Sequence, residues 1–184
     1  MSYAEYLALE ERSPGKHEYL RGEVFAMSGG TPVHAALIAE MIGQLRAGLQ
    51  PPCRVYSSDL KVRVEETDFS CFPDATVVCG KIVASPIDKN AVTNPRLVVE
   101  ILSDSTEAHD RGAKAAHYRR IASLAEIVLV SSLEPLVEVH RRNERGLWEL
   151  ASEARAGTSF TLSSLGLTVD IDSLYGDLLS HQSS

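Results

Sequence analysis

Two short runs of β-forming residues near the middle of the chain each contain a single carboxylate, and this feature constrains the fold most. Asp74 opens an apolar run that continues through Val78, and Glu100 lies near the end of the run from Leu97 to Leu102. A carboxylate in such a run costs free energy when it is buried without a partner. A cation shared by two neighbouring strands would offset that cost. We therefore expect the runs to be adjacent strands whose acidic side chains meet.

A helix is predicted soon after the second run, over residues 106–120, capped at its first residue or at Ser105. Asp110, Lys114 and Tyr118 are spaced four residues apart, so they share one face of that helix. Lys114 could pair with Asp110 as an exposed contact, worth only about 0.3–0.5 kcal/mol. Alternatively, it could reach back over the end of the Glu100 strand. An aspartate, a glutamate and a lysine delivered to one place are the groups that metal-assisted hydrolysis of a phosphodiester needs.

The rest of the chain reads as a mixture of strands and helices without repeats or linkers. A first long helix is predicted over residues 33–49, with Thr31 as its cap and Pro32 at its first position. Its apolar stripe has the helical period and consists of Leu37, Ile38, Met41, Ile42 and Leu45. Further predicted elements are a helix at 2–12, two strands within 17–27, a strand at 54–65, a polar loop at 85–94, strands at 125–131, 137–141 and 147–151, and a closing helical turn at 171–175.

The size and composition of the chain indicate a single globular domain spanning residues 1–184. No apolar run approaches the roughly 20 residues that cross a bilayer, and the first residues do not resemble a signal peptide. Three cysteines, Cys53, Cys71 and Cys79, are odd in number and lack Cys-x-x-Cys spacing. We therefore predict no disulfide framework, no thiolate zinc site, no membrane partner and a cytoplasmic location.

The net charge of −7 is unusual for a protein that binds nucleic acid. Acidic residues gathered around a divalent ion would account for part of it, because the ion reverses the local field. Two arginine pairs, Arg119-Arg120 and Arg141-Arg142, could form a basic patch, although each pair taken alone is more typical of a solvated surface.

The carboxylates suit magnesium or manganese. Magnesium binds hard oxygen ligands, usually one or two carboxylates together with waters and phosphate oxygens. Asp74 and Glu100 are the predicted metal ligands, and the carbonyl of Ile101 adds a ligand if the strand end is exposed. Such an ion would polarise the scissile phosphate and lower the pKa of its bound water. The ammonium of Lys114 would stabilise the developing negative charge or position the water.

A series of motifs in a fixed order runs along nearly the whole chain. It consists of His17-Glu18-Tyr19-Leu20-Arg21-Gly22-Glu23-Val24, His34, Pro73-Asp74, Leu97-Val98-Val99-Glu100-Ile101-Leu102-Ser103, Ser105-Thr106, Asp110, Lys114 and Tyr118. This series resembles the PD-(D/E)XK nuclease superfamily, the restriction-endonuclease fold, and more narrowly its Uma-two family. Pro-Asp alone carries no signal, but the series in this order is specific.

The resemblance implies an α/β fold with a mixed central sheet flanked by helices, and a site at the sheet edge where Asp74 and Glu100 meet. It also implies metal-dependent cleavage of DNA. In the superfamily's commonest form a lysine lies two residues after the glutamate, where this chain has Leu102. The amine would therefore come from Lys114, a relocation that the superfamily tolerates.

Two further residues are candidates for auxiliary roles. The resemblance suggests Glu23 as a second-metal ligand or base, although carboxylates beside turns are common. His34, at a helix start, could bind phosphate or carry a proton, or could be a hydrogen-bonded structural histidine. Glu18 and Tyr118 are interpreted as supporting or core residues.

The interpretation is an endonuclease that acts on DNA as a homodimer, because a two-fold pair most simply cuts both strands of a duplex. A catalytically inactive module that binds protein or nucleic acid is the alternative. The acidic balance and Leu102 favour that alternative, and the retained Asp74, Glu100 and Lys114 oppose it. Action on RNA or another phosphodiester is a third possibility.

Overall fold

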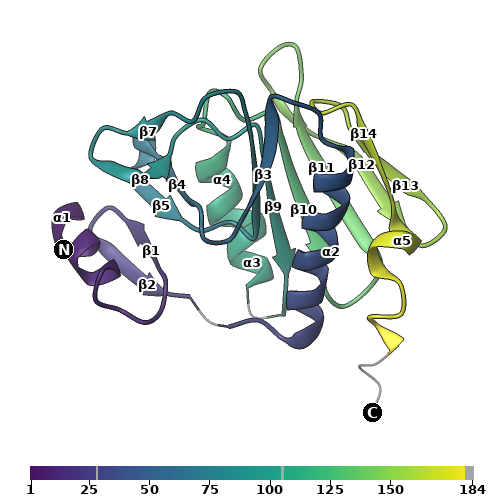
Figure 1. The fold of residues 1–184 in the computed structure, drawn as a ribbon, viewed down its shortest axis with the longest axis horizontal. Helices are drawn as coiled ribbons and strands as arrows, with labels where there is room; N and C mark the ends of the chain where they lie inside the picture. Colours follow the sequence, from purple (N-terminus) through teal and green to yellow (C-terminus); the bar gives the residue numbers. More distant parts are fainter. Residues whose placement is uncertain (28, 105, 181–184) are drawn as a thin grey trace.

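The computed structural model describes residues 1–27, 29–104 and 106–180, and two six-stranded sheets form most of it (Figure 1). The central sheet has the strand order β12-β11-β10-β9-β6-β3. Its strands β9 and β10 run parallel, and its other neighbours run antiparallel. The strands of this sheet are β3 (Cys53–Ser57), β6 (Ala75–Cys79), β9 (Leu97–Leu102), β10 (Glu126–Ser131), β11 (Leu136–Arg142) and β12 (Trp148–Arg155).

The second sheet has the order β2-β1-β5-β4-β8-β7, with a parallel pair between β4 and β8. Its strands are β1 (His17–Leu20), β2 (Glu23–Ala26), β4 (Lys61–Val64), β5 (Phe69–Cys71), β7 (Ala84–Ser85) and β8 (Asp88–Val92). A separate hairpin consists of β13 (Ser159–Leu162) and β14 (Leu167–Asp170).

The helices cover the central sheet on both faces (Figure 1). Helix α2 packs on one face together with α5, and the helical segment from α3 to α4 lies on the other face, toward the second sheet. The predicted fold class, a mixed sheet flanked by helices, is therefore confirmed. The helical elements are α1 (Tyr3–Glu10), α2 (Pro32–Gly48), η1 (Glu65–Thr67), α3 (Glu107–His109), η2 (Asp110–Lys114), α4 (Ala115–Tyr118) and α5 (Ile171–Tyr175).

Helix α2 forms as its apolar period predicts. Leu37, Met41 and Leu45 are fully buried against the central sheet, and Ile38 and Ile42 pack beside them. Burial of this stripe fixes the rotation of α2 on the sheet, and thereby the direction in which its first turn points. Within the described residues, no helix is both long and apolar enough to span a bilayer.

The helix predicted over 106–120 is present but is interrupted by one π-helical turn, η2, between α3 and α4. Its predicted polar face is buried: Asp110 is 5% exposed, Lys114 4% and Tyr118 0%. The predicted cap at Ser105 lies outside the described residues. Thr106 precedes α3, and its side chain makes no capping hydrogen bond among the described residues. The face therefore points into the molecule, not into solvent.

Two predicted elements are wrong in detail. The strand predicted over 54–65 is two strands, because a turn closed by the hydrogen bond from Leu60 N to Ser57 O (3.0 Å) passes the chain from the central sheet to the second sheet. The loop predicted over 85–94 contains the second residue of β7 and the whole of β8. Strand β8 ends in buried apolar residues and pairs with β4, so it completes the second sheet despite its polar start.

Cys53 and Cys79 form a disulfide, so the prediction that the cysteines are not disulfide-bonded is wrong for this pair. The two residues lie directly opposite each other on the adjacent strands β3 and β6. The two cysteines are 26 residues apart in the sequence, and no spacing motif indicated that they pair. Cys71 is buried and free. The cytoplasmic location remains a prediction, and a disulfide does not favour it.

Candidate active site

Asp74 and Glu100 come together at the ends of two inner strands of the central sheet. Strands β6 and β9 pair antiparallel, with Ala75 opposite Val99. Asp74, which precedes Ala75, is therefore opposite Glu100, which follows Val99. The carboxylate of Asp74 accepts a hydrogen bond from the amide of Ile101 at 2.7 Å. Both acidic side chains line one cavity of about 150 Å³. The carboxylates thus meet as expected, but within the sheet and not at its lateral edge.

Glu100 is buried, and its described partners contact the same carboxylate oxygen. It is 3% exposed, and its Oε1 lies 2.9 Å from Nζ of Lys114 and accepts a hydrogen bond from the hydroxyl of Tyr118. Burial raises the pKa of Glu100 to about 8, against the opposing charge of Lys114. A further cation beside Glu100 would favour its ionised form. Both described partners bind Oε1, so Oε2 is the oxygen that remains for a metal.

Lys114 joins three carboxylates in the interior. Its Nζ lies 2.9 Å from Glu100 Oε1, 3.2 Å from Glu18 Oε1 and 3.2 Å from Asp110 Oδ1. Three carboxylates therefore lie within ion-pair distance of one ammonium. Burial lowers the pKa of Lys114, but the charges of Glu100 and Glu18 outweigh it and hold that pKa well above its ordinary value. Lys114 therefore stays protonated and compensates this acidic cluster.

Glu18 belongs to this site more closely than its sequence position suggested. It lies on β1 of the second sheet and is 6% exposed. Its Oε1 contacts Lys114, and its Oε2 lies 3.0 Å from Nε2 of His109. The signal that identified Asp74 and Glu100, a carboxylate inside a short β run, is also present at Glu18. What the sequence did not show is that the second sheet brings β1 against η2.

His34 lies at the mouth of the same cavity, in the first turn of α2. The predicted cap is confirmed, because the side chain of Thr31 accepts a hydrogen bond from the amide of His34 at 3.2 Å. The imidazole Nε2 lies 3.5 Å from Asp74 Oδ2, and its hydrogen bond to Asp74 raises the pKa of His34, with a smaller contribution from the backbone of Ile101. A Cβ on Gly30 would stand 2.3 Å from Nδ1 of this ring, so a larger residue there would force the ring to move.

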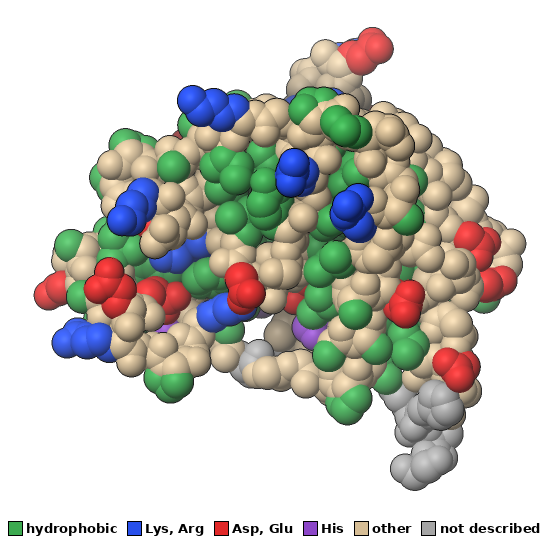
Figure 2. Space-filling model, viewed as in Figure 1, with side chains coloured by type: hydrophobic (Ala, Val, Ile, Leu, Met, Phe, Trp, Pro, Cys, Tyr) green, Lys and Arg blue, Asp and Glu red, His purple; other side chains and the backbone are tan. Residues whose placement is uncertain are grey.

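The structure does not bring Glu23 to this cavity. Glu23 is exposed at the first position of β2, opposite Leu20, and it does not line the cavity. The residues of this segment that line the cavity are Phe25 and Ala26 at the other end of β2, and Met27 directly after it. Figure 2 shows histidine, acidic and basic side chains gathered around an opening on one face of the molecule.

The oxygen donors at this cavity fit a hard divalent cation. Asp74 and Glu100 supply carboxylates, and the backbone of Ile101 lines the same space. Among the described residues, no three His, Cys, Asp or Glu side chains form a complete metal centre. Magnesium characteristically retains waters and binds only one or two carboxylates together with phosphate oxygens, so a two-carboxylate set suits it.

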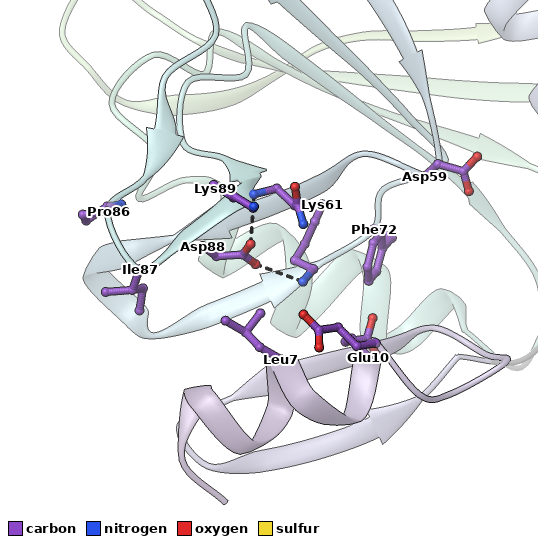
Figure 3. A pocket seen from close by; sticks show the side chains of 11 residues that line it. Leu7, Glu10, Asp59, Lys61, Phe72, Pro86, Ile87, Asp88 and Lys89 are labelled. Carbon is purple, nitrogen blue, oxygen red and sulfur yellow. Dashed lines mark hydrogen bonds and ion pairs between the residues drawn. The ribbon is translucent and has the colours of Figure 1, made fainter.

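A larger cavity, of about 620 Å³, lies between α1 and β8 (Figure 3). Figure 3 shows Lys61 and Asp88 pointing toward each other there, with 2.9 Å between Nζ and Oδ2. The hydroxyl of Tyr3 also donates to Asp88, at 3.0 Å. This buried pair is satisfied by its own partners, and the cavity contains none of the residues around Glu100. We assign no chemistry to it.

The protein is an α/β protein with an acid-lined cavity at the ends of two inner strands of its central sheet. The crystal structure of a "putative nuclease belonging to DUF820" from Anabaena variabilis shares the fold, with a TM-score of 0.77 over 97% of this chain and 99% of that chain, at 20% identity. The chain belongs to the Uma2 family, whose model, described as "Putative restriction endonuclease", matches residues 3–172. The family resemblance inferred from the sequence is therefore confirmed.

Two cyanobacterial relatives come from Synechocystis. The uncharacterized protein slr1290 is 35% identical over 185 residues, which cover 97% of this chain and 93% of the relative. The uncharacterized protein sll1609 is 28% identical over 151 residues, which cover 82% of this chain and 85% of the relative. These relatives support the family, and their names assign no activity.

Proposed function

We propose that this protein is a divalent-metal-dependent endonuclease that hydrolyses DNA phosphodiester bonds. The observation that carries the proposal is the charge of the cavity. Four carboxylates, from Glu18, Asp74, Glu100 and Asp110, line it together with the single ammonium of Lys114 and the imidazole of His34. With all acids ionised, negative charge exceeds positive charge, and a divalent cation is the group that would balance it.

The proposed ligands are Asp74, Glu100 and the carbonyl of Ile101, with magnesium or manganese as the ion. A bound divalent ion supplies Lewis-acid polarisation of the phosphate and a water of lowered pKa. The protein's own contribution is to hold the two carboxylates in place. Asp74 is fixed by the amide of Ile101, and Glu100 is fixed by Lys114 and Tyr118. Such preorganised groups cost no rearrangement during the reaction.

Lys114 and His34 have different proposed roles. Because Lys114 lies within ion-pair distance of three carboxylates, it acts by orienting Glu100 and by opposing the effect of burial on that acid. His34 lies nearer the mouth, 3.5 Å from Asp74, with a raised pKa. It is the group positioned to donate a proton to the leaving oxygen or to bind a phosphate oxygen.

The proposed substrate is DNA, which the description of the family supports, and the proposed active form is a homodimer, which the chemistry of duplex cleavage supports. One cavity of about 150 Å³ serves one phosphodiester. Cutting both strands of a duplex therefore calls for two sites, most simply from two copies related by a two-fold axis.

Metal removal tests the proposal. We expect the native protein to cleave plasmid or oligonucleotide DNA with Mn²⁺ or Mg²⁺ present, and to lose all cleavage in EDTA, because the acidic cavity alone repels a phosphate. The assay follows end-labelled products on denaturing gels, with a matching RNA substrate run in parallel. Cleavage that continues in EDTA contradicts the proposal. Absence of cleavage under every metal condition favours the inactive binding module, and cleavage of the RNA alone changes the substrate class.

A further inference from the structure

Phe25 is the one exposed aromatic ring beside this cavity. Its relative exposure is 47%, whereas every other Phe, Tyr and Trp of the described chain is buried or half-buried. Phe25 lines the cavity, and none of the ring–ring contacts of the described residues involves it. A single exposed apolar side chain is common on a protein surface, so the informative feature of Phe25 is its place beside the acid-lined cavity.

The backbone places this ring directly over the acidic cluster. Strands β1 and β2 pair with Glu18 opposite Phe25, so the two side chains lie on the same face of the hairpin. Glu18 reaches inward to Lys114. Phe25 stands at the outer side of the same group of residues, on β2, which is a lateral edge strand of the second sheet.

The size of the cavity determines what can enter it. At about 150 Å³ it is well below the roughly 300 Å³ at which pockets begin to enclose a drug-sized ligand. A phosphate with its waters fits a space of this kind, but a nucleoside must remain outside. The base attached to a bound phosphate therefore lies at the mouth, where Phe25 is.

We propose that Phe25 stacks on the base of the nucleotide next to the scissile phosphate, and so positions that phosphate against Asp74 and Glu100; this inference rests on the proposed function. A base inside a duplex already has a neighbour on each face. The ring can therefore stack only on an unpaired or extruded base. The substrate class that follows is DNA with an unstacked nucleotide beside the cut, such as single strands, gaps or flaps. Because every base has a π-face, this contact sets structure preference and not sequence preference.

Binding tests the stacking without requiring cleavage. Single-stranded oligonucleotides carrying 2-aminopurine are titrated with protein in Ca²⁺, an oxygen-binding divalent ion that balances the acidic cavity, and stacking is read as quenching of their fluorescence. We expect quenching by the native protein and by Phe25→Trp, and loss of quenching with roughly fivefold or greater loss of affinity in Phe25→Ala. Leu150→Ala removes an equally exposed apolar side chain on β12, far along the chain from this site, and is the matched control. Equal quenching by native protein and Phe25→Ala overturns the proposal.

Cleavage separates this inference from the proposed function. We expect native protein to cut gapped DNA faster than intact duplex, and Phe25→Ala to lose that preference, mainly through KM. An abasic nucleotide beside the cut should slow native protein and leave Phe25→Ala unchanged. If Phe25→Ala cuts every substrate as native protein does, stacking is wrong while the nuclease stands. If native protein cuts nothing, the nuclease is wrong, and the fluorescence titration still decides whether Phe25 binds a base.

Discussion

Replacing Lys114 with methionine is expected to lower the free energy of unfolding by about 3–5 kcal/mol at neutral pH. The ammonium is the only protein cation within 4 Å of Glu100 among the described residues, and it also contacts Glu18 and Asp110. Methionine fills much of the same volume but leaves three buried carboxylates facing one another. An uncompensated buried charge of this kind is among the most destabilising single changes.

The difference in free energy of unfolding between native protein and Lys114→Met should depend on pH. The pKa of Glu100 is raised to about 8 in the folded protein, above its unfolded value, so its contribution to stability is fully present below the unfolded pKa and is lost as pH rises through about 8. Without Lys114 this loss is larger, because nothing opposes the charge on the ionised acid. The deficit of Lys114→Met should therefore grow as the pH rises above about 8, where native protein stops losing stability and the variant continues to lose it.

Thermal and urea unfolding measure the effect. The expected decrease in Tm is about 6–20 °C for a chain of this length. Lys16→Met is the control, because Lys16 forms an exposed ion pair with Asp59 that should contribute less than about 1 kcal/mol. Equal stability of native protein and Lys114→Met at about pH 8 would show that Lys114 does not compensate the acidic cluster.

Glu100→Gln is expected to reduce DNA cleavage by at least about a hundredfold while the protein stays folded. Glutamine keeps the volume and one oxygen that can accept the hydrogen bond from Tyr118, so packing is preserved. It removes the negative charge that would bind the metal. Because ionising the buried acid costs stability at neutral pH, its neutral replacement should not lower Tm appreciably.

Single-turnover cleavage with saturating Mn²⁺ gives the rate, and circular dichroism confirms the fold. Glu40→Gln makes the same chemical change at an exposed position of α2 and should cleave as native protein does. Native-like cleavage by Glu100→Gln would remove Glu100 from the reaction. Loss of the fold would instead show that its charge is structural.

Much of the site was predictable from sequence because its residues carry a local signal. Asp74 and Glu100 are carboxylates in β runs, a pattern that water-soluble strands avoid unless a partner is present. The spacing of Asp110 and Lys114 places both on one helix face, and the structure buries that face although the sequence alone also allowed an exposed pair.

What could not be predicted depends on contacts between distant segments. Glu18 carries the same signal as Glu100, but only the pairing of the second sheet brings it to Lys114. The disulfide of Cys53 depends likewise on the register of β3 and β6. Glu23 was proposed from resemblance, and the hairpin turn leaves it outside the cavity.

Titration of the native protein with Mn²⁺ by calorimetry tests most directly whether Asp74 and Glu100 hold one divalent ion. The titration is run at about pH 8.5, above the pKa of Glu100, because a metal binds the ionised carboxylate. We predict one bound ion per chain in native protein and in Glu40→Gln, and none in Asp74→Asn, where the amide still occupies the carboxylate's place beside Ile101. Absence of binding to native protein, or equal binding to Asp74→Asn, contradicts the account.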